Sequence, residues 1–182
     1  MNRAQKELEE KLLAEAAAVL GLPPDQVLFQ TGHEPANRDR GRRAAALAEL
    51  RAAVFLKEQG FTAIRLVPPS SRPTADLLAS RGKRTYAFEV RCVTKESSFS
   101  APDAARAPEA VLAGKFRAKV KQAGAFRKRE ALDALGVILV LGSGGGDLAA
   151  LARAAYGSAG SPAGAHVCVL AGAEFGIWPP WA

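Results

Sequence analysis

The chain has 182 residues, a length that suits one domain, and 48% of them are hydrophobic, which allows a sizeable core. Its formal charge of +7 permits a polyanionic partner but does not identify one. No apolar run reaches the ~18 residues of a membrane span, and the charged N-terminus lacks the apolar core of a signal peptide, so we expect a cytoplasmic protein without membrane contact.

Two helices are predicted in the first third of the chain. Residues 2–20 carry apolar side chains at helical spacing, Gly21 ends that helix, and Pro23-Pro24 prevents its return. Residues 22–41 are rich in loop-forming residue types and are predicted to form a loop. Residues 42–59 are apolar over most of a helical circumference, so we expect that helix to be largely buried.

The rest of the chain alternates strand and helix patterns. The predicted strands are 61–67, 74–80, 85–93, 136–142 and 165–171; the predicted helices are 108–134 and 146–157; the tail 174–182 is predicted to be irregular. Three consecutive strands followed by αβ units predict an α/β fold, with a mixed central sheet of an antiparallel meander plus parallel strands and helices on both faces.

A hairpin turn sets the register of the second and third strands. Gly82-Lys83 suits a two-residue type II′ turn. Paired residue numbers then have a constant sum, which places Asp76 directly opposite Glu89 with their Cβ atoms roughly 4.5–5.5 Å apart. Two opposed carboxylates repel unless a cation lies between them, and Mg²⁺ prefers oxygen ligands.

The third strand alternates between two faces. Glu89 and Arg91 point to the same face, so a phosphate bound at the metal would meet Arg91. The alternative is an exposed sheet face with ordinary charge pairs.

These residues resemble the PD-(D/E)XK nuclease superfamily, with its restriction-endonuclease-like fold, and among its members most nearly the small Holliday-junction-resolvase-like proteins. The pattern is a helix bearing Glu49, Asp76 on the second strand, and Glu89-Val90-Arg91 on the third. The resemblance covers about residues 42–142. It implies one domain, 1–182, with an extension at 1–41, a nuclease-like core at 42–142, and a C-terminal helix and strand at 143–182.

The resemblance implies that Asp76, Glu89 and the Val90 carbonyl hold Mg²⁺ or Mn²⁺. Arg91 stands where the family has a lysine that positions or activates the attacking water. Arginine cannot accept a proton at ordinary pH, but it can hold a phosphate and stabilise charge. Lys95 shares the face but is roughly 13 Å along the strand, whereas Lys115 or Lys119 from the following helix could reach in.

Glu49 lies in a mostly apolar helix, where a carboxylate needs a partner. One interpretation makes it a third acid of the metal site, direct or through water. The other pairs it with a nearby arginine such as Arg42.

The segment 115–129 has seven basic residues and no acid. It predicts a phosphate-contacting helix beside the site, with a solvated basic face as the alternative. The candidate nucleic-acid-binding residues are Arg42, Arg43, Lys95, Lys115, Lys119, Lys121 and Gln122.

Other signals are weaker. Gly142 to Asp147 lacks the ending of a phosphate-binding loop, so we expect a turn with Asp147 as helix N-cap. Cys92 and Cys168 are expected to be buried thiols, and no zinc-binding pattern occurs. Trp178 and Trp181 could cover the core or form a contact between subunits.

The leading hypothesis is a Mg²⁺-dependent DNA endonuclease, with branched or structured DNA among its candidate substrates. The alternatives are a catalytically inactive nuclease-fold DNA-binding protein and an interaction protein with no nucleic-acid role. The sequence does not decide between DNA and RNA. It also leaves the sequence preference and the oligomeric state undecided, with a homodimer as one alternative.

Overall fold

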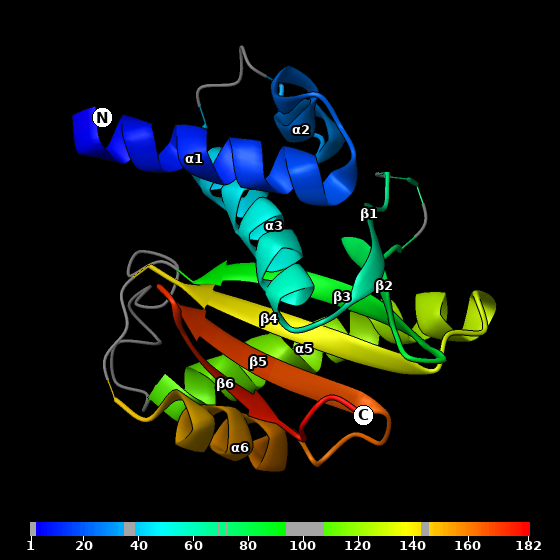
Figure 1. Ribbon diagram of the computed structural model, residues 1–182. Coiled ribbons are helices and arrows are strands. Elements are labelled where there is room, and N and C mark those ends of the chain that lie inside the picture. The colour runs from blue at the N-terminus through cyan, green and yellow to red at the C-terminus, as the bar shows by residue number, and fades with distance from the viewer. Residues whose placement is uncertain (1–2, 35–38, 69, 72, 94–107, 143–145) are drawn as a thin grey trace.

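A computed structural model describes residues 3–34, 39–68, 70–71, 73–93, 108–142 and 146–182. Its centre is a single sheet in which the strands follow one another in chain order (Figure 1). The strands are β1 (Thr62–Leu66), β2 (Leu77–Arg81), β3 (Arg84–Val93), β4 (Ala134–Leu141), β5 (Ala165–Ala171) and β6 (Glu174–Trp178).

The sheet is mixed, as the sequence predicts. β1, β2 and β3 form an antiparallel meander, β3, β4 and β5 are parallel, and β6 returns antiparallel to β5. Every residue of β5 is buried, and so is every residue of β4 except the last. Strands covered on both faces have this continuous apolar pattern.

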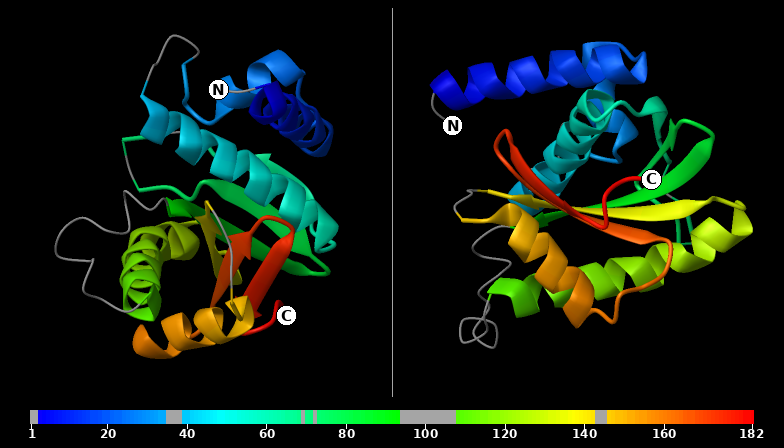
Figure 2. Two further views of the ribbon diagram at one scale, coloured as in Figure 1. Left: turned by 90° about the vertical axis from the view of Figure 1, so that its left-hand side faces the viewer. Right: turned by 60° about the horizontal axis from the view of Figure 1, so that its bottom comes forward.

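Helices lie on both faces of the sheet (Figure 2). On one face lies α3 (Arg40–Glu58), with α1 (Arg3–Leu20) and α2 (Pro24–Gln30) stacked outside it. On the opposite face lie α5 (Pro108–Arg129) and α6 (Leu148–Ser158). No single described helix has the length and hydropathy to cross a membrane, although the bent pair α1 and α2 meets that test together.

Two predictions about chain segments are wrong. The segment 22–41 contains α2, which begins at Pro24, because proline is favoured in the first turn of a helix even though it ends the previous one. It also contains the first two residues of α3 and its N-cap Asp39, whose side chain accepts hydrogen bonds from two backbone amides. The tail contains β6, which pairs with β5 through a tight turn at Gly172.

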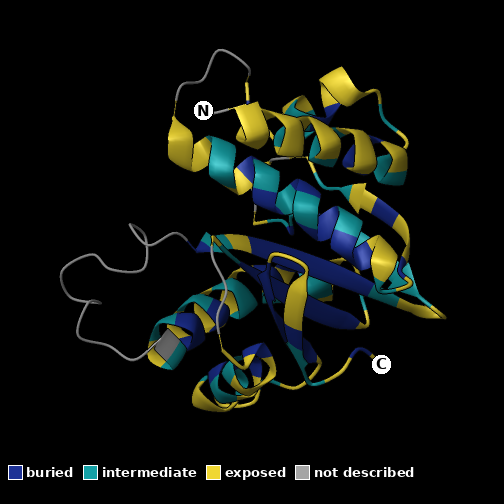
Figure 3. Ribbon diagram, turned by 60° about the vertical axis from the view of Figure 1, so that its left-hand side comes forward, coloured by how far each residue is buried: buried dark blue, intermediate teal, exposed yellow. Residues whose placement is uncertain are grey.

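The core has two main parts, one on each side of the sheet, and the buried residues concentrate on the central strands (Figure 3). Trp181 belongs to the part under α3, where its ring makes edge contacts with Phe61, Tyr86 and Phe88. This places Trp181 over the core. Cys168 is buried, Cys92 is half-buried, and neither forms a disulfide.

Position 136 on β4 must be a glycine because the Phe88 ring lies very close to the backbone there. A Cβ atom there would lie 2.2 Å from the Cε1 atom of Phe88. The Phe88 ring can therefore lie flat over β4 only because position 136 has no side chain.

Candidate functional site

The β2–β3 hairpin has the predicted register. Its pairs run from Arg81 opposite Arg84 to Leu77 opposite Phe88, and Gly82 has a φ of 58°, as the first position of a type II′ turn requires. The predicted alternation also holds, because Phe88 and Val90 pack under α3 whereas Ala87 and Val93 pack on the α5 side.

Asp76 lies one residue beyond the last regular pair of this hairpin. Its amide donates a 2.9 Å hydrogen bond to the Phe88 carbonyl, and its Oδ2 accepts a 2.6 Å hydrogen bond from the Val90 amide. Asp76 is therefore bonded to the residues on both sides of Glu89. The pKa of Asp76 is raised by burial, while the charge of Lys119 and the Val90 amide oppose that shift.

Glu89 is fully buried in the centre of β3. Its Oε2 atom accepts a 2.5 Å hydrogen bond from Lys119 Nζ on α5, and this ion pair has little exposure on either side. Its Oε1 atom is buried, and among the described residues it has no hydrogen-bond partner. Burial, and then the charge of Asp76, raise the pKa of Glu89 to about 7, although Lys119 lowers it.

Glu49 joins this group from α3, the helix on the opposite face. Burial is the main cause that raises its pKa to about 8, with further contributions from the charges of Asp76 and Glu89 and an opposing one from Lys119. Arg42 instead lies 3.9 Å from Asp39. The structure thus places Glu49 beside the two predicted metal ligands and not beside Arg42.

The three carboxylates and Lys119 form what we call the acidic cluster. Burial is the main cause that raises all three pKa values. One lysine also cannot balance the charge of three ionised carboxylates. Such a cluster either retains protons or binds a further cation. Perturbed carboxyl groups gathered at one point are typical of functional sites.

The cluster opens into a pocket of about 370 Å³. Glu49 and Asp76 line it together with Thr31 from the end of α2, the connection between β1 and β2, and Gln122 from α5. A hydrogen bond of 2.9 Å from the Val67 amide to the Asp76 carbonyl closes that connection at its base. The pocket therefore brings together residues from four separate parts of the chain.

The donor set fits a hard divalent cation held by few protein ligands. Within the described residues, no three His, Cys, Asp or Glu side chains are placed to hold a metal ion together. Mg²⁺ commonly uses one or two carboxylates and keeps several waters. Asp76 and Glu89, whose buried Oε1 atom has no hydrogen-bond partner among the described residues, match that requirement.

Arg91 lies farther along β3 than Glu89 and is exposed. The cation that contacts Glu89 is Lys119, from the helix that follows in the sequence. Of Lys115 and Lys119, which the sequence indicates as lysines that could reach the site, Lys119 is the one shown in contact with Glu89.

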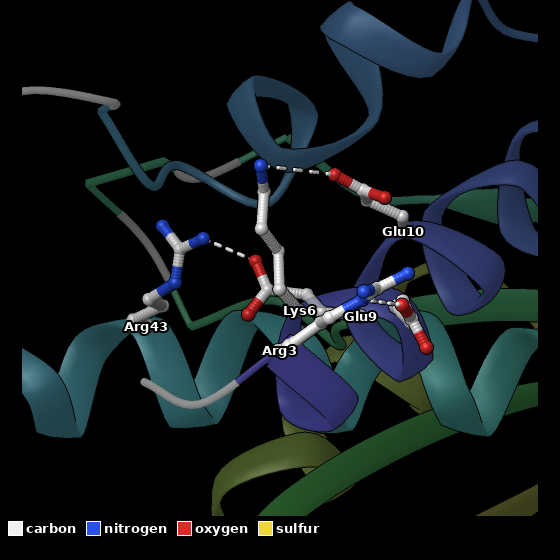
Figure 4. Close-up of polar contacts among 6 residues, drawn as sticks. Arg3, Lys6, Glu9, Glu10 and Arg43 are labelled. Carbon is white, nitrogen blue, oxygen red and sulfur yellow. Dashed lines mark hydrogen bonds and ion pairs between the residues drawn. The ribbon is translucent and has the colours of Figure 1, made fainter.

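The other predicted nucleic-acid-binding residues that the structure describes lie on α3 and α5. Arg43 contacts Glu9 of α1, so its charge is paired within the protein (Figure 4). Arg42 and Lys121 are exposed, Lys115 is half-buried, Gln122 lines the pocket, and Lys95 lies outside the described residues. At the start of α6, Asp147 is the predicted N-cap and accepts a hydrogen bond from the Ala150 amide.

The fold and site describe an α/β protein with a mixed sheet and a buried acidic cluster. No protein-family model and no curated protein matches the chain. A solved chain from the CdiA-CT/CdiI toxin and immunity complex of Burkholderia pseudomallei is similar to it, with a TM-score of 0.51 and 17% identity over 81% of this chain and 94% of that one. At this identity the likeness shows a related fold alone.

Proposed function

We propose that this protein is a Mg²⁺-dependent nuclease of PD-(D/E)XK type that hydrolyses phosphodiester bonds in DNA. The observation that carries the proposal is the convergence of Asp76, Glu89 and Lys119, because two buried carboxylates with one lysine are the charged groups that this chemistry requires. Mn²⁺ would fit the same oxygen ligands.

Asp76 and Glu89 would hold the cation, with the Val90 carbonyl as a further ligand. The hydrogen bond from the Val90 amide fixes the orientation of the Asp76 carboxylate. Glu49 would support the site through water. A bound Mg²⁺ supplies positive charge that activates water and polarises the phosphate.

Lys119 takes the role of the family's lysine in this proposal. It reaches the site from α5, so the Arg91 substitution on β3 does not remove the lysine from the cluster. Its ammonium group can donate hydrogen bonds to phosphate oxygens while Arg91, exposed nearby on β3, clamps the strand by its guanidinium.

The runner-up is an inactive nuclease-fold protein that binds DNA without cutting it, and its basis is the Arg91 substitution. The position of Lys119 favours the active protein. Arg91→Lys separates the two hypotheses, because it would create cleavage only in an inactive protein.

A cleavage assay on single-stranded, duplex and branched DNA, with Mg²⁺ or with EDTA, tests the proposal. We expect metal-dependent cleavage that Asp76→Asn and Lys119→Ala abolish. Asp25→Asn, at an exposed position on α2, serves as the matched control and should cut normally. Cleavage that survives Asp76→Asn would refute the mechanism.

The structural neighbour indicates a second kind of partner besides DNA, namely a protein. It is part of a toxin and immunity complex, so we also propose a protein partner for this chain.

A further inference from the structure

The acidic cluster is recessed below the protein surface. Glu89 has no exposed surface, and Asp76 and Glu49 line the pocket described above. A phosphodiester that enters this pocket can therefore approach these carboxylates.

The size of the pocket restricts what can enter. About 370 Å³ lies near the lower end of the range of roughly 300–1,000 Å³ for small-molecule sites. A pocket of this size suits one nucleotide and not a base pair. Enzymes that bring a nucleotide into a pocket act on a single strand or extrude that nucleotide from the duplex.

The lining of the pocket is suited to a sugar and phosphate. Its polar members besides the two carboxylates are hydroxyl and amide side chains: Thr31, Ser70, Ser71, Thr74 and Gln122. The Thr31 hydroxyl already donates to the Leu28 carbonyl at 2.6 Å, so toward a ligand it acts as an acceptor. Hydroxyl and amide groups of this kind commonly bind phosphate and sugar oxygens.

The walls of the pocket also limit base recognition. Its described apolar lining residues are Val67, Pro73 and Ala75, and none of the described residues that line it is aromatic. Base stacking on an aromatic ring is the usual means of holding an unpaired base. The pocket should therefore hold the sugar and phosphate without strong preference among bases.

We propose that this pocket admits one unpaired nucleotide, so that the substrate is single-stranded or locally unpaired nucleic acid and not an intact duplex. The inference rests on the proposed function, because it assumes that the acidic cluster is the reaction centre. It adds the substrate class to that function.

Fluorescence anisotropy with a labelled oligonucleotide of mixed sequence tests the proposal. The oligonucleotide is used as a single strand and annealed to its complement, and Ca²⁺ replaces Mg²⁺ in both measurements. We expect the wild-type protein to bind the single strand at least about tenfold more tightly than the duplex. Gln122→Phe and, from the other wall, Ser71→Phe should each weaken single-strand binding by about tenfold because the added ring fills the pocket.

Ala125→Phe is the matched control for Gln122→Phe, since Ala125 is exposed on the same helix and does not line the pocket. It should bind like the wild type. Equal binding of single strand and duplex, or unchanged binding by both pocket variants, would overturn the proposal.

A cleavage arm with Mg²⁺ separates this proposal from the proposed function. If no substrate is cut but the single strand is bound selectively through the pocket, the nuclease proposal fails and the pocket proposal stands. If single strand and duplex are cut at equal rates, the nuclease proposal stands and the pocket proposal fails.

Discussion

Replacing Lys119 with methionine removes the positive charge that contacts Glu89 and keeps a long, flexible side chain in its place. In the wild type, Lys119 Nζ lies 2.5 Å from Glu89 Oε2 inside the protein. Without the ammonium, the Glu89 carboxylate would be buried and unpaired, and a buried acid responds to this by retaining its proton. The pKa of Glu89, about 7 with Lys119 present, should therefore rise further.

The sign of the pH dependence follows from this shift. A carboxyl group whose pKa is higher in the folded than in the unfolded protein binds protons more tightly when folded, so its contribution to stability falls as pH rises. For wild-type Glu89 this loss runs from the ordinary carboxyl pKa of 4.5 up to about pH 7. In Lys119→Met it continues above pH 7, at about 1.4 kcal/mol for each further pH unit.

The two proteins should differ most at high pH. At pH 5, where Glu89 is protonated in both folded proteins, we expect Lys119→Met to cost about 1 kcal/mol for the lost hydrogen bond. At pH 8 the cost should be greater by a further ~1.4 kcal/mol. Urea unfolding in EDTA, followed by tryptophan fluorescence, measures both values.

Lys121→Met is the matched control for Lys119→Met, because Lys121 is exposed on the same helix. It should cost less than about 0.5 kcal/mol at either pH. A cost for Lys119→Met that is the same at pH 5 and pH 8, or that Lys121→Met reproduces, would refute the electrostatic reasoning about Glu89.

Three further changes have defined outcomes in urea unfolding. Glu49→Gln should stabilise the metal-free protein by about 2–4 kcal/mol at pH 8 and hardly at pH 5, because the pKa of Glu49 is about 8; a gain independent of pH would contradict this. Gly136→Ala should destabilise the protein by about 1–3 kcal/mol, because the added methyl group clashes with Phe88. Its control, Gly114→Ala, lies in open space on α5 and should stabilise the protein by up to about 1 kcal/mol. Equal effects of the two substitutions would contradict the close approach of Phe88 to Gly136. Asp147→Ala should cost about 1 kcal/mol through loss of the α6 cap, and no change would show that the cap is dispensable.

The sequence was sufficient for the parts of the fold that depend on local patterns. The hairpin register follows from one turn and a period of two, so the positions of Asp76 and Glu89 could be placed without a structure. Continuous apolar runs likewise identified β4 and β5. Patterns of this kind depend on few residues and are little affected by distant contacts.

Two errors came from local signals that have more than one meaning. Proline ends one helix and starts another, so Pro24 was taken for a breaker although it opens α2. The β5–β6 connection has the same kind of two-residue turn as the β2–β3 hairpin. Gly172-Ala173 joins Ala171 to Glu174, just as Gly82-Lys83 joins Arg81 to Arg84. The same register rule could have found β6.

The choice among the candidate members of the acidic cluster needed the tertiary structure. Glu49 approaches from α3 and Lys119 from α5, which cover opposite faces of the sheet. Spacing along the chain does not indicate that two helices on opposite faces of the sheet contribute to one site. For the same reason the sequence could not show that Arg43 is paired with Glu9.

The central claim is that Asp76 and Glu89 together hold a divalent cation. The most direct test is the anomalous scattering signal of Mn²⁺ in crystals of the wild-type protein. We predict a peak between the Asp76 and Glu89 carboxylates, with Lys119 Nζ moved away from Glu89 Oε2. A saturating concentration of Mn²⁺ that leaves no peak there, with the Lys119–Glu89 ion pair intact, would contradict the claim.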